Sequence, residues 1–186
     1  MSEFQRLKIP DLVLVKPKRY GDSRGYFSEV YHAERYAEGG IDCGFVQDNH
    51  SLSAPKGVLR GLHFQTNPSP QAKLVRCTRG RILDIAVDIR YGSETFGRHV
   101  GVELTEENGL QLYVPVGFAH AFCTLEENCE VQYKVSGYYA PECDGGVAFD
   151  DPDLGIKWPF PIDELVISDK DKVLPRLVDL PVTFRV

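Results

Sequence analysis

The amino-acid sequence predicts an all-β protein in which many short strands form a sandwich or barrel, with short helices at its periphery. Short apolar or alternating runs recur along most of the chain, and Gly, Pro, Asn and Asp break them at intervals typical of strand ends. A chain of 186 residues with 42% hydrophobic content can bury one sizeable core. The sequence also contains no internal repeat and no low-complexity linker. We therefore expect a single domain over residues 1–186.

The predicted strands follow one another as short segments separated by turns. They cover residues 12–16, 58–64, 74–77, 81–89, 99–104, 111–114 and 130–135. One helix is expected over residues 32–38, because Gly39 and Gly40 would end it, and a short turn over residues 164–166. Residues 139–161 are rich in Pro, Gly and Asp, so we expect them to run over the surface without regular structure.

The charge and the cysteine content argue against several classes of function. The formal net charge is -6, whereas a nucleic-acid-binding surface needs a dense basic stripe. No apolar run is long enough to cross a bilayer, and the first residues lack the pattern of a secretory signal. We therefore expect a cytoplasmic protein that binds neither membranes nor nucleic acid. The five cysteines form no Cys-x-x-Cys pair, so we interpret them as reduced thiols, most of them packed.

Two segments resemble the motifs of cupin barrels. The first motif, Gly-x5-His-x-His with a later Glu, begins at Gly57 and keeps His63, but Gln65 replaces its second His and Lys73 its Glu. The second motif, Gly-x5-Pro-x-Gly-x2-His, is complete and ends at His120. These motifs predict a cupin-type jelly-roll barrel that has lost the ligands of a divalent metal, because a lysine would repel the cation. We expect no metal and no cofactor, and instead a pocket suited to an anion or to negative charge that develops during a reaction.

The side chains around the first motif form a candidate site, although each also has a purely structural explanation. His63 taken alone fits a hydrogen-bonded core histidine. Arg60 is expected on the same face as His63, and Lys73 on the adjacent strand. Both charges would be costly to bury without a functional partner, which favours a site.

Other candidates remain open from the residues alone. His120 fits either a ligand contact or a core hydrogen bond, and Tyr133 fits core packing better than catalysis. Residues 45–51 form either a hydrated turn or a recognition strand with several donors and acceptors. Residues 22–29 form either a solvated hairpin or a second wall of the pocket.

Taken together, these segments resemble the dTDP-4-dehydrorhamnose 3,5-epimerases, which are metal-free cupins of nucleotide-sugar metabolism. The resemblance covers nearly the whole chain. The matching segments are residues 21–29, 45–51, 57–65, 73–77, 84–90, 95–97, 117–120, 133–134, 150–152, 158–159 and 168–171. The resemblance implies an isomerase that acts on dTDP-4-dehydro-6-deoxy-D-glucose in dTDP-L-rhamnose synthesis. Such an enzyme removes the protons on C3 and C5 and returns them from the other face.

The resemblance also implies roles for four side chains. His63 would be the base, and Asp171 would orient it and stabilise its imidazolium. Tyr133 would be the acid on the opposite face, and we expect nearby Lys73 to make its phenol a readier donor. Lys73 would itself face the enolate oxygen.

Further positions of the family motif are implied to bind the substrate. These are Arg24, Phe27, Glu29, Gln47, Asp48, Asn49, Arg60, His120, Tyr139, Asp144 and Lys170. Arg24 and Lys170 would meet the diphosphate, while Tyr139 would stack on the thymine with Glu29 at its polar edge. The family further implies a homodimer in which amino-terminal strands cross to the partner and complete its site.

Rival functions share the same framework. Relatives that invert only C3 or only C5 would carry the same motifs, and a non-catalytic sugar-binding cupin would use the same pocket. A metal cupin oxygenase or isomerase is disfavoured, because Gln65 and Lys73 spoil the ligand set.

Overall fold

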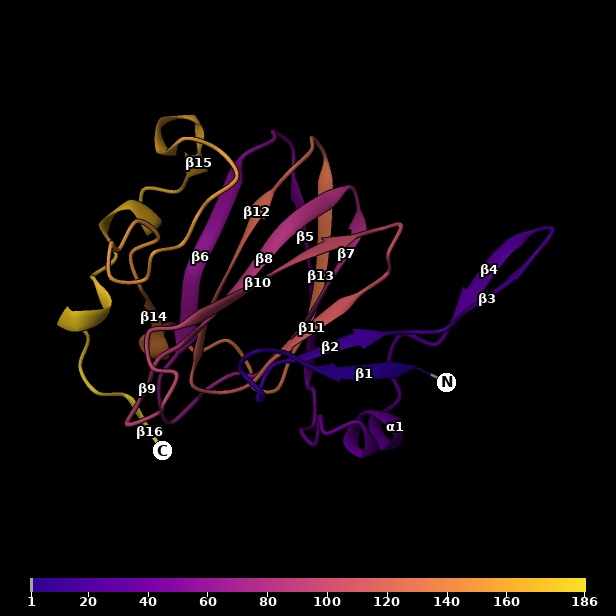
Figure 1. Ribbon diagram of the computed structural model, residues 1–186, viewed down its shortest axis with the longest axis horizontal. Coiled ribbons are helices and arrows are strands. Elements are labelled where there is room, and N and C mark those ends of the chain that lie inside the picture. The colour runs from indigo at the N-terminus through magenta and orange to yellow at the C-terminus, as the bar shows by residue number, and fades with distance from the viewer. Residues whose placement is uncertain (1) are drawn as a thin grey trace.

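Two six-stranded sheets face each other in the structure, a computed structural model that describes residues 2–186 (Figure 1). The first sheet contains β1 (Glu3–Arg6), β2 (Val13–Lys16), β5 (Gln47–Ser53), β7 (Lys73–Arg79), β11 (Gln111–Val114) and β13 (Cys129–Val135). The second contains β6 (Val58–Gln65), β8 (Arg81–Asp88), β10 (His99–Thr105), β12 (Phe118–Thr124), β14 (Asp144–Gly146) and β15 (Val166–Ile167). The strand orders are β1-β2-β11-β7-β13-β5 and β10-β8-β12-β6-β14, with β15 parallel to β6.

The core fills the space between the two sheets. Because side chains alternate along a strand, each sheet sends every second residue inward. Val75 and Val131 from the first sheet thus share one buried cluster with Ile82 and Leu104 from the second. Each such aliphatic side chain contributes about 1.5–3 kcal/mol when it is fully buried. The predicted all-β jelly roll is confirmed, and the predicted strands lie where the sequence places them to within two residues at most ends.

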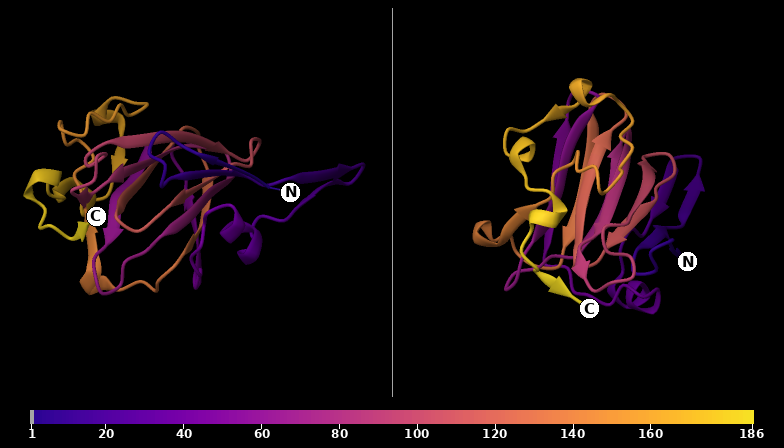
Figure 2. Two further views of the ribbon diagram at one scale, coloured as in Figure 1. Left: turned by 60° about the horizontal axis from the view of Figure 1, so that its bottom comes forward. Right: turned by 60° about the vertical axis from the view of Figure 1, so that its left-hand side comes forward.

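The outer face of the second sheet is covered by the C-terminal part of the chain (Figure 2). Leu62 and Phe64 of β6 pack on this side against Leu154, Leu177 and Phe184. The covering segment contains short 3-10 helices and a final strand. They are η1 (Pro141–Cys143), η2 (Ile162–Glu164), η3 (Asp171–Val173), η4 (Leu177–Asp179) and β16 (Phe184–Arg185), which pairs with β9 (Arg90–Tyr91).

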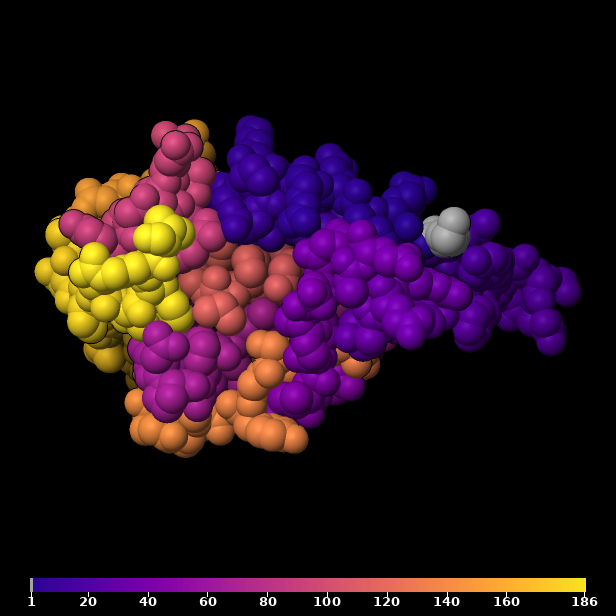
Figure 3. All heavy atoms as spheres, turned by 90° about the horizontal axis from the view of Figure 1, so that it is seen from below, coloured from indigo at the N-terminus to yellow at the C-terminus, as the bar shows by residue number. Residues whose placement is uncertain are grey.

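The segment between the first two strands of the first sheet and β5 departs from the body. β3 (Arg19–Asp22) and β4 (Gly25–Ser28) form a hairpin arm that projects from one end of the molecule (Figure 3). The arm exposes large aromatic side chains, with Phe27 69% accessible. The helix α1 (Ala33–Glu38) confirms the prediction for residues 32–38. Among residues 2–186, the structure shows no helix long and apolar enough to span a bilayer.

The expectation that residues 139–161 lack regular structure is wrong at β14. This strand has the sequence Asp-Gly-Gly, which has a low strand propensity, yet it pairs with the edge of β6. The glycines allow the close approach, because a Cβ on Gly146 would lie 2.7 Å from the carbonyl oxygen of Leu62. The predicted turn over residues 164–166 is likewise replaced by the end of η2 and the start of β15.

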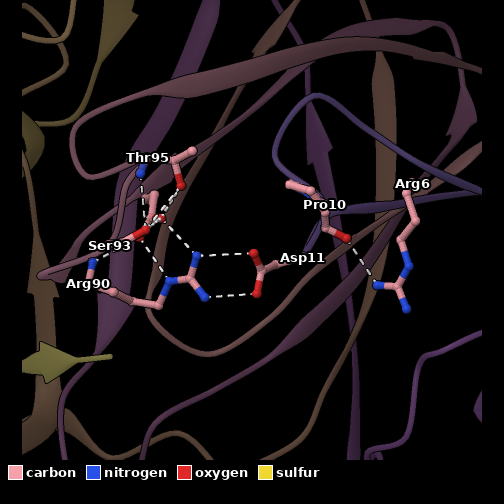
Figure 4. A network of polar contacts seen from close by, with 7 residues as sticks. Arg6, Pro10, Asp11, Arg90, Ser93 and Thr95 are labelled. Atoms are coloured by element: carbon pink, nitrogen blue, oxygen red, sulfur yellow. Dashed lines mark hydrogen bonds and ion pairs between the residues drawn. The ribbon is translucent and has the colours of Figure 1, made fainter.

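A polar network fastens the end of β8 to the loop after it (Figure 4). Asp88 is fully buried and accepts hydrogen bonds from Arg90, Ser93 and Thr95 at 2.6–2.9 Å. The guanidinium of Arg90 also pairs with Asp11, which ties the N-terminal segment to the same network. Burial acts to raise the pKa of Asp88, but these donors outweigh it and hold the pKa below its ordinary value.

We expect Asp88→Asn to lower the free energy of unfolding by about 2–4 kcal/mol, because it leaves buried donors unpaired and weakens a buried ion pair. The matched control is Asp169→Asn, since the fully exposed Asp169 pairs with Lys172 at the surface and its loss should leave stability nearly unchanged. Urea unfolding of both variants measures the two effects. Equal stabilities would contradict the role assigned to the network.

Candidate active site

Two neighbouring cavities are lined by strands of both sheets. The larger, here called the inner cavity, has a volume of about 550 Å³, and the smaller, here called the outer cavity, has a volume of about 360 Å³. His63 on β6, Lys73 on β7 and Tyr133 on β13 line both of them. His63 therefore approaches from the second sheet, whereas Lys73 and Tyr133 approach from the first.

A bulge in β6 lets two of its polar side chains share one cavity. Arg60 and His63 are three residues apart, so regular alternation would place them on opposite faces. The register against β12 shifts between them, because Arg60 lies opposite Phe122 and His63 opposite His120. Gly61 accommodates the bulge with a φ of +121, and a Cβ there would lie 2.5 Å from the carbonyl oxygen of His120. Both side chains consequently line the inner cavity, as expected from the sequence but through a bulge rather than alternation.

His63 and Asp171 form a hydrogen-bonded pair at the cavity wall. The Nε2 atom of His63 lies 2.7 Å from Oδ1 of Asp171, which is almost fully buried. The other carboxylate oxygen accepts the backbone N–H of Gly61 at 3.2 Å. Burial acts to raise the pKa of Asp171, but these bonds and one with Ser168 hold it below its ordinary value. An ionised Asp171 accepts the proton on Nε2, so the lone pair of a neutral His63 is on Nδ1.

His120 forms a second, deeper pair with Asp84. Its Nε2 atom lies 3.0 Å from both carboxylate oxygens of Asp84, and Asp84 is completely buried. Burial lowers the pKa of His120, although Asp84 acts in the opposite direction. The neutral ring donates from Nε2 and presents Nδ1 as an acceptor. The sequence interpretation missed Asp84, and the available signal was a carboxylate within the apolar run of β8.

Lys73 and Tyr133 lie on neighbouring, paired strands, and their pKa values are shifted in opposite directions. Burial lowers the pKa of Lys73 to about 8, against the opposing charges of Asp84 and Asp144. Burial raises the pKa of Tyr133, with Arg60 acting against the rise. The expectation that Lys73 makes Tyr133 more acidic is therefore wrong. Tyr133 remains protonated near neutral pH and is able to donate a proton.

The outer cavity gathers further predicted residues. Its wall includes Gln47, Asn49, Tyr139 and Asp144. Asp144 pairs with Lys170, which lines the inner cavity, and accepts a hydrogen bond from the hydroxyl of Tyr139 at 3.4 Å. The ion pair thus bridges the rims of the two cavities.

Four predicted binding residues lie elsewhere in this chain. Asp48 pairs with Lys134 at 2.9 Å on the opposite side of β5 from Gln47 and Asn49. Arg24 and Phe27 are on the projecting arm, and Glu29, just after it, pairs with Arg35. The three residues of the arm and its base would have to act at the site of a second subunit.

Gln65, which stands where the first cupin motif has its second histidine, makes structural hydrogen bonds. Gln65 is buried, and its amide makes hydrogen bonds to Ser69, Tyr138 and Ala140. Within residues 2–186, no group of three or more His, Cys, Asp or Glu side chains is arranged to hold a metal ion. All five cysteines are free thiols and four of them are buried, as predicted.

Known proteins resemble this chain over most of its length. Residues 6–179 match the family model described as dTDP-4-dehydrorhamnose 3,5-epimerase. A dTDP-4-dehydrorhamnose 3,5-epimerase from Sinorhizobium fredii is 50% identical over 182 residues, which cover 98% of this chain and 93% of the relative. A dTDP-4-dehydrorhamnose 3-epimerase from Streptomyces niveus is 38% identical over 161 residues, covering 86% and 77% of the two chains.

Solved structures share the fold. A dTDP-6-deoxy-D-glucose-3,5-epimerase from Legionella pneumophila, in complex with dTDP-4-keto-L-rhamnose, superimposes with a TM-score of 0.95. The two sequences are 42% identical, and the match covers 100% of this chain and 99% of the other.

We expect Lys73 to titrate near pH 8, because burial disfavours its ammonium. Trace acetylation over a range of pH, read by mass spectrometry and normalised to each lysine's own plateau, gives the midpoint. Asp84→Asn should move that midpoint lower still, since the Asp84 carboxylate favours the charged amine. A midpoint near the value of about 10.4 for an unfolded peptide would contradict the desolvation assigned to the partly buried Lys73.

Proposed function

Because the chain belongs to the dTDP-4-dehydrorhamnose 3,5-epimerase family, we propose that it converts dTDP-4-dehydro-6-deoxy-D-glucose into dTDP-4-dehydro-L-rhamnose. This isomerisation inverts C3 and C5 and belongs to dTDP-L-rhamnose synthesis. The observation that supports it best is that His63 and Tyr133 reach one cavity from opposite sheets. Inversion of a carbon needs a base on one face of the ring and an acid on the other.

The 4-keto group makes both inversions possible. Each of C3 and C5 neighbours the ketone, so the electron pair left by a departing proton moves onto the carbonyl oxygen as an enolate. Nδ1 of His63 takes the proton, and the Tyr133 hydroxyl gives one to the same carbon from the other face. His63 then releases its proton to solvent and Tyr133 regains one. No electron acceptor is needed, because the sugar has the same oxidation level before and after. General acid or base help of this kind contributes about 10²–10⁴-fold in rate.

Lys73 is suited to the enolate oxygen. Its ammonium comes from the first sheet next to Tyr133 and is more than half protonated below pH 8, given its lowered pKa of about 8. A preorganised donor aimed at developing negative charge contributes about 3–4 kcal/mol. Lys73 is partly buried, so water screens its charge less than it would in bulk solution and the ammonium interacts more strongly with an oxyanion.

The two buried carboxylates keep the imidazoles in defined tautomers. Asp171 holds the proton on Nε2 of His63, which leaves Nδ1 free to act as base and stabilises the imidazolium that forms. Asp84 holds the proton on Nε2 of His120 in the same way, and we assign the neutral His120, together with Arg60, to binding the sugar in the inner cavity.

The nucleotide extends into the outer cavity in this proposal. Tyr139 stacks on the thymine, while Gln47, Asn49 and Asp144 offer polar contacts, and Lys170 meets the diphosphate. Asp48 lies on the far side of β5, where it pairs with Lys134 and makes no direct contact with the nucleotide in this proposal.

We further propose that residues 1–186 form one epimerase domain that works as a homodimer. The projecting arm and its base would bring Arg24, Phe27 and Glu29 to the partner's outer cavity. The exposed aromatic side chains of the arm support this assignment, because they would stabilise the protein only when a partner buries them. The five unpaired thiols fit a reducing compartment, and we place the enzyme in the cytoplasm.

A single-centre epimerase is the second candidate. The observation that favours it is the 38% identity to the 3-epimerase from Streptomyces niveus. The higher identity of 50% to the 3,5-epimerase from Sinorhizobium fredii favours inversion at both carbons.

In heavy water, with no cofactor added, we expect the enzyme to introduce deuterium at both C3 and C5 of the dTDP-4-keto sugar. Each inverted carbon must take its new hydrogen from an exchangeable group. Proton NMR of the sugar signals, followed with time, measures the two sites separately. Exchange at a single carbon would establish the single-centre alternative, and no exchange would leave only a sugar-binding cupin.

We expect Tyr133→Phe to uncouple exchange from inversion. His63 can still remove the proton and return deuterium to the same face, so exchange persists while epimerisation falls by about 10²–10⁴-fold. Asp171→Asn should instead slow both by similar factors, because it disturbs the base itself.

Tyr91→Phe is the matched control for Tyr133→Phe, since Tyr91 is half exposed on β9. It should leave both rates unchanged. If Tyr133→Phe lost exchange and inversion equally, Tyr133 would not be the acid on the opposite face.

A further inference from the structure

We propose that Gln65 is a positioning residue for the nucleotide part of the substrate. Its buried amide fixes the loop of residues 137–140, here called the Tyr139 loop, at the mouth of the outer cavity. This inference rests on the proposed function, because it assigns the outer cavity to the nucleotide. It gives a role to the one metal-ligand position of the first cupin motif that the proposed chemistry leaves unused.

The Gln65 amide makes three hydrogen bonds to backbone groups. Nε2 donates to the carbonyl oxygens of Ser69 at 2.6 Å and Tyr138 at 3.2 Å. Oε1 accepts the N–H of Ala140 at 3.0 Å. The amide therefore holds the residues immediately before and after Tyr139, and the side chain of Gln65 is 4% exposed.

The same position of β6 also places Asp144. Gln65 is the register partner of Asp144 in the pairing of β6 with β14. Asp144 in turn contacts the hydroxyl of Tyr139 and pairs with Lys170. Gln65 thus connects, through its side chain and its backbone, the residues that form the outer rim of the site.

Only a neutral amide satisfies this arrangement. Two carbonyl oxygens require two N–H donors and one N–H requires an acceptor, which is the inventory of a glutamine side chain. A neutral histidine has one donor and one acceptor, and a glutamate has no donor when ionised. Because Nε2 has no donor left over, Gln65 acts on a ligand through the loop rather than by donating to it.

Fixing the loop before binding should strengthen binding. A loop that is already ordered loses less conformational entropy when the ligand arrives. His63 is two residues away on β6, and its bonds to Asp171 involve none of the atoms that Gln65 uses. The loss of Gln65 should therefore weaken binding far more than it slows proton transfer.

The test is Gln65→Leu, which keeps the side-chain volume and removes the amide. We expect its Kd for dTDP, measured by calorimetry, to rise about tenfold. KM for the 4-keto sugar nucleotide should rise by a similar factor, while kcat changes less than about threefold. Amide hydrogen exchange should become faster at Ala140 and stay unchanged around Asp171.

Asn108→Leu is the matched control. The Asn108 amide also makes three hydrogen bonds that hold a loop, to Thr105, Leu110 and Glu103, but away from both cavities. It should leave Kd and KM unchanged even where it lowers stability.

The outcomes separate this inference from the function on which it rests. If the unmodified protein fails to bind dTDP, the proposed function is wrong. If it binds dTDP and Gln65→Leu binds it equally well, or if Gln65→Leu lowers kcat with KM unchanged, the positioning role is wrong. Should Gln65→Leu fail to fold, Gln65→Met replaces it, because methionine keeps the length of the side chain and also removes the amide. That variant should raise Kd by a similar factor, and an unchanged Kd would overturn the inference.

Discussion

The spacing between the two sheets is the constraint on which the site depends. Packed sheets lie about 10 Å apart, a gap that side chains fill from both sides. Where the inner layer is polar rather than aliphatic, the same gap becomes a cavity whose opposite walls belong to different sheets. His63 and Tyr133 occupy those walls, so the fold places the proposed base and the proposed acid on opposite sides of one cavity.

Burial then acts on the pKa values of Lys73, Tyr133 and Asp171. Asp171 and Asp84 are buried with an imidazole each, and the hydrogen bonds compensate for the lost hydration. Lys73 has weaker compensation from more distant carboxylates, and its pKa falls accordingly. The cavity consequently holds a lysine that interacts strongly with any anion, beside a tyrosine that keeps its proton. In the proposed reaction, the Lys73 ammonium is the group that stabilises the negative charge of the enolate.

Sequence patterns alone predicted the all-β class, seven of the twelve strands of the two large sheets and the helix after the arm, because alternation and turn residues act locally. The cupin motifs, in which Gln65 and Lys73 replace two metal ligands, likewise indicated a cationic pocket containing His63, Lys73 and His120. Local patterns failed at β14, where Asp-Gly-Gly has no strand signal and forms a strand only because the edge of β6 is within reach. They also missed Asp84, whose role depends on a histidine 36 residues away.

The sequence by itself thus determined which residues alternate toward a core and which motif carries the polar groups. The tertiary structure decided which of those groups meet. The bulge at Gly61 brings Arg60 and His63 to one side, and the facing of two sheets opposes His63 to Tyr133. Desolvation, which raises the pKa of Tyr133 where a neighbouring lysine was expected to lower it, likewise exists only after the chain has closed around the site. The physical reason is that contacts and water exclusion between distant strands depend on packing, which no local run of residues encodes.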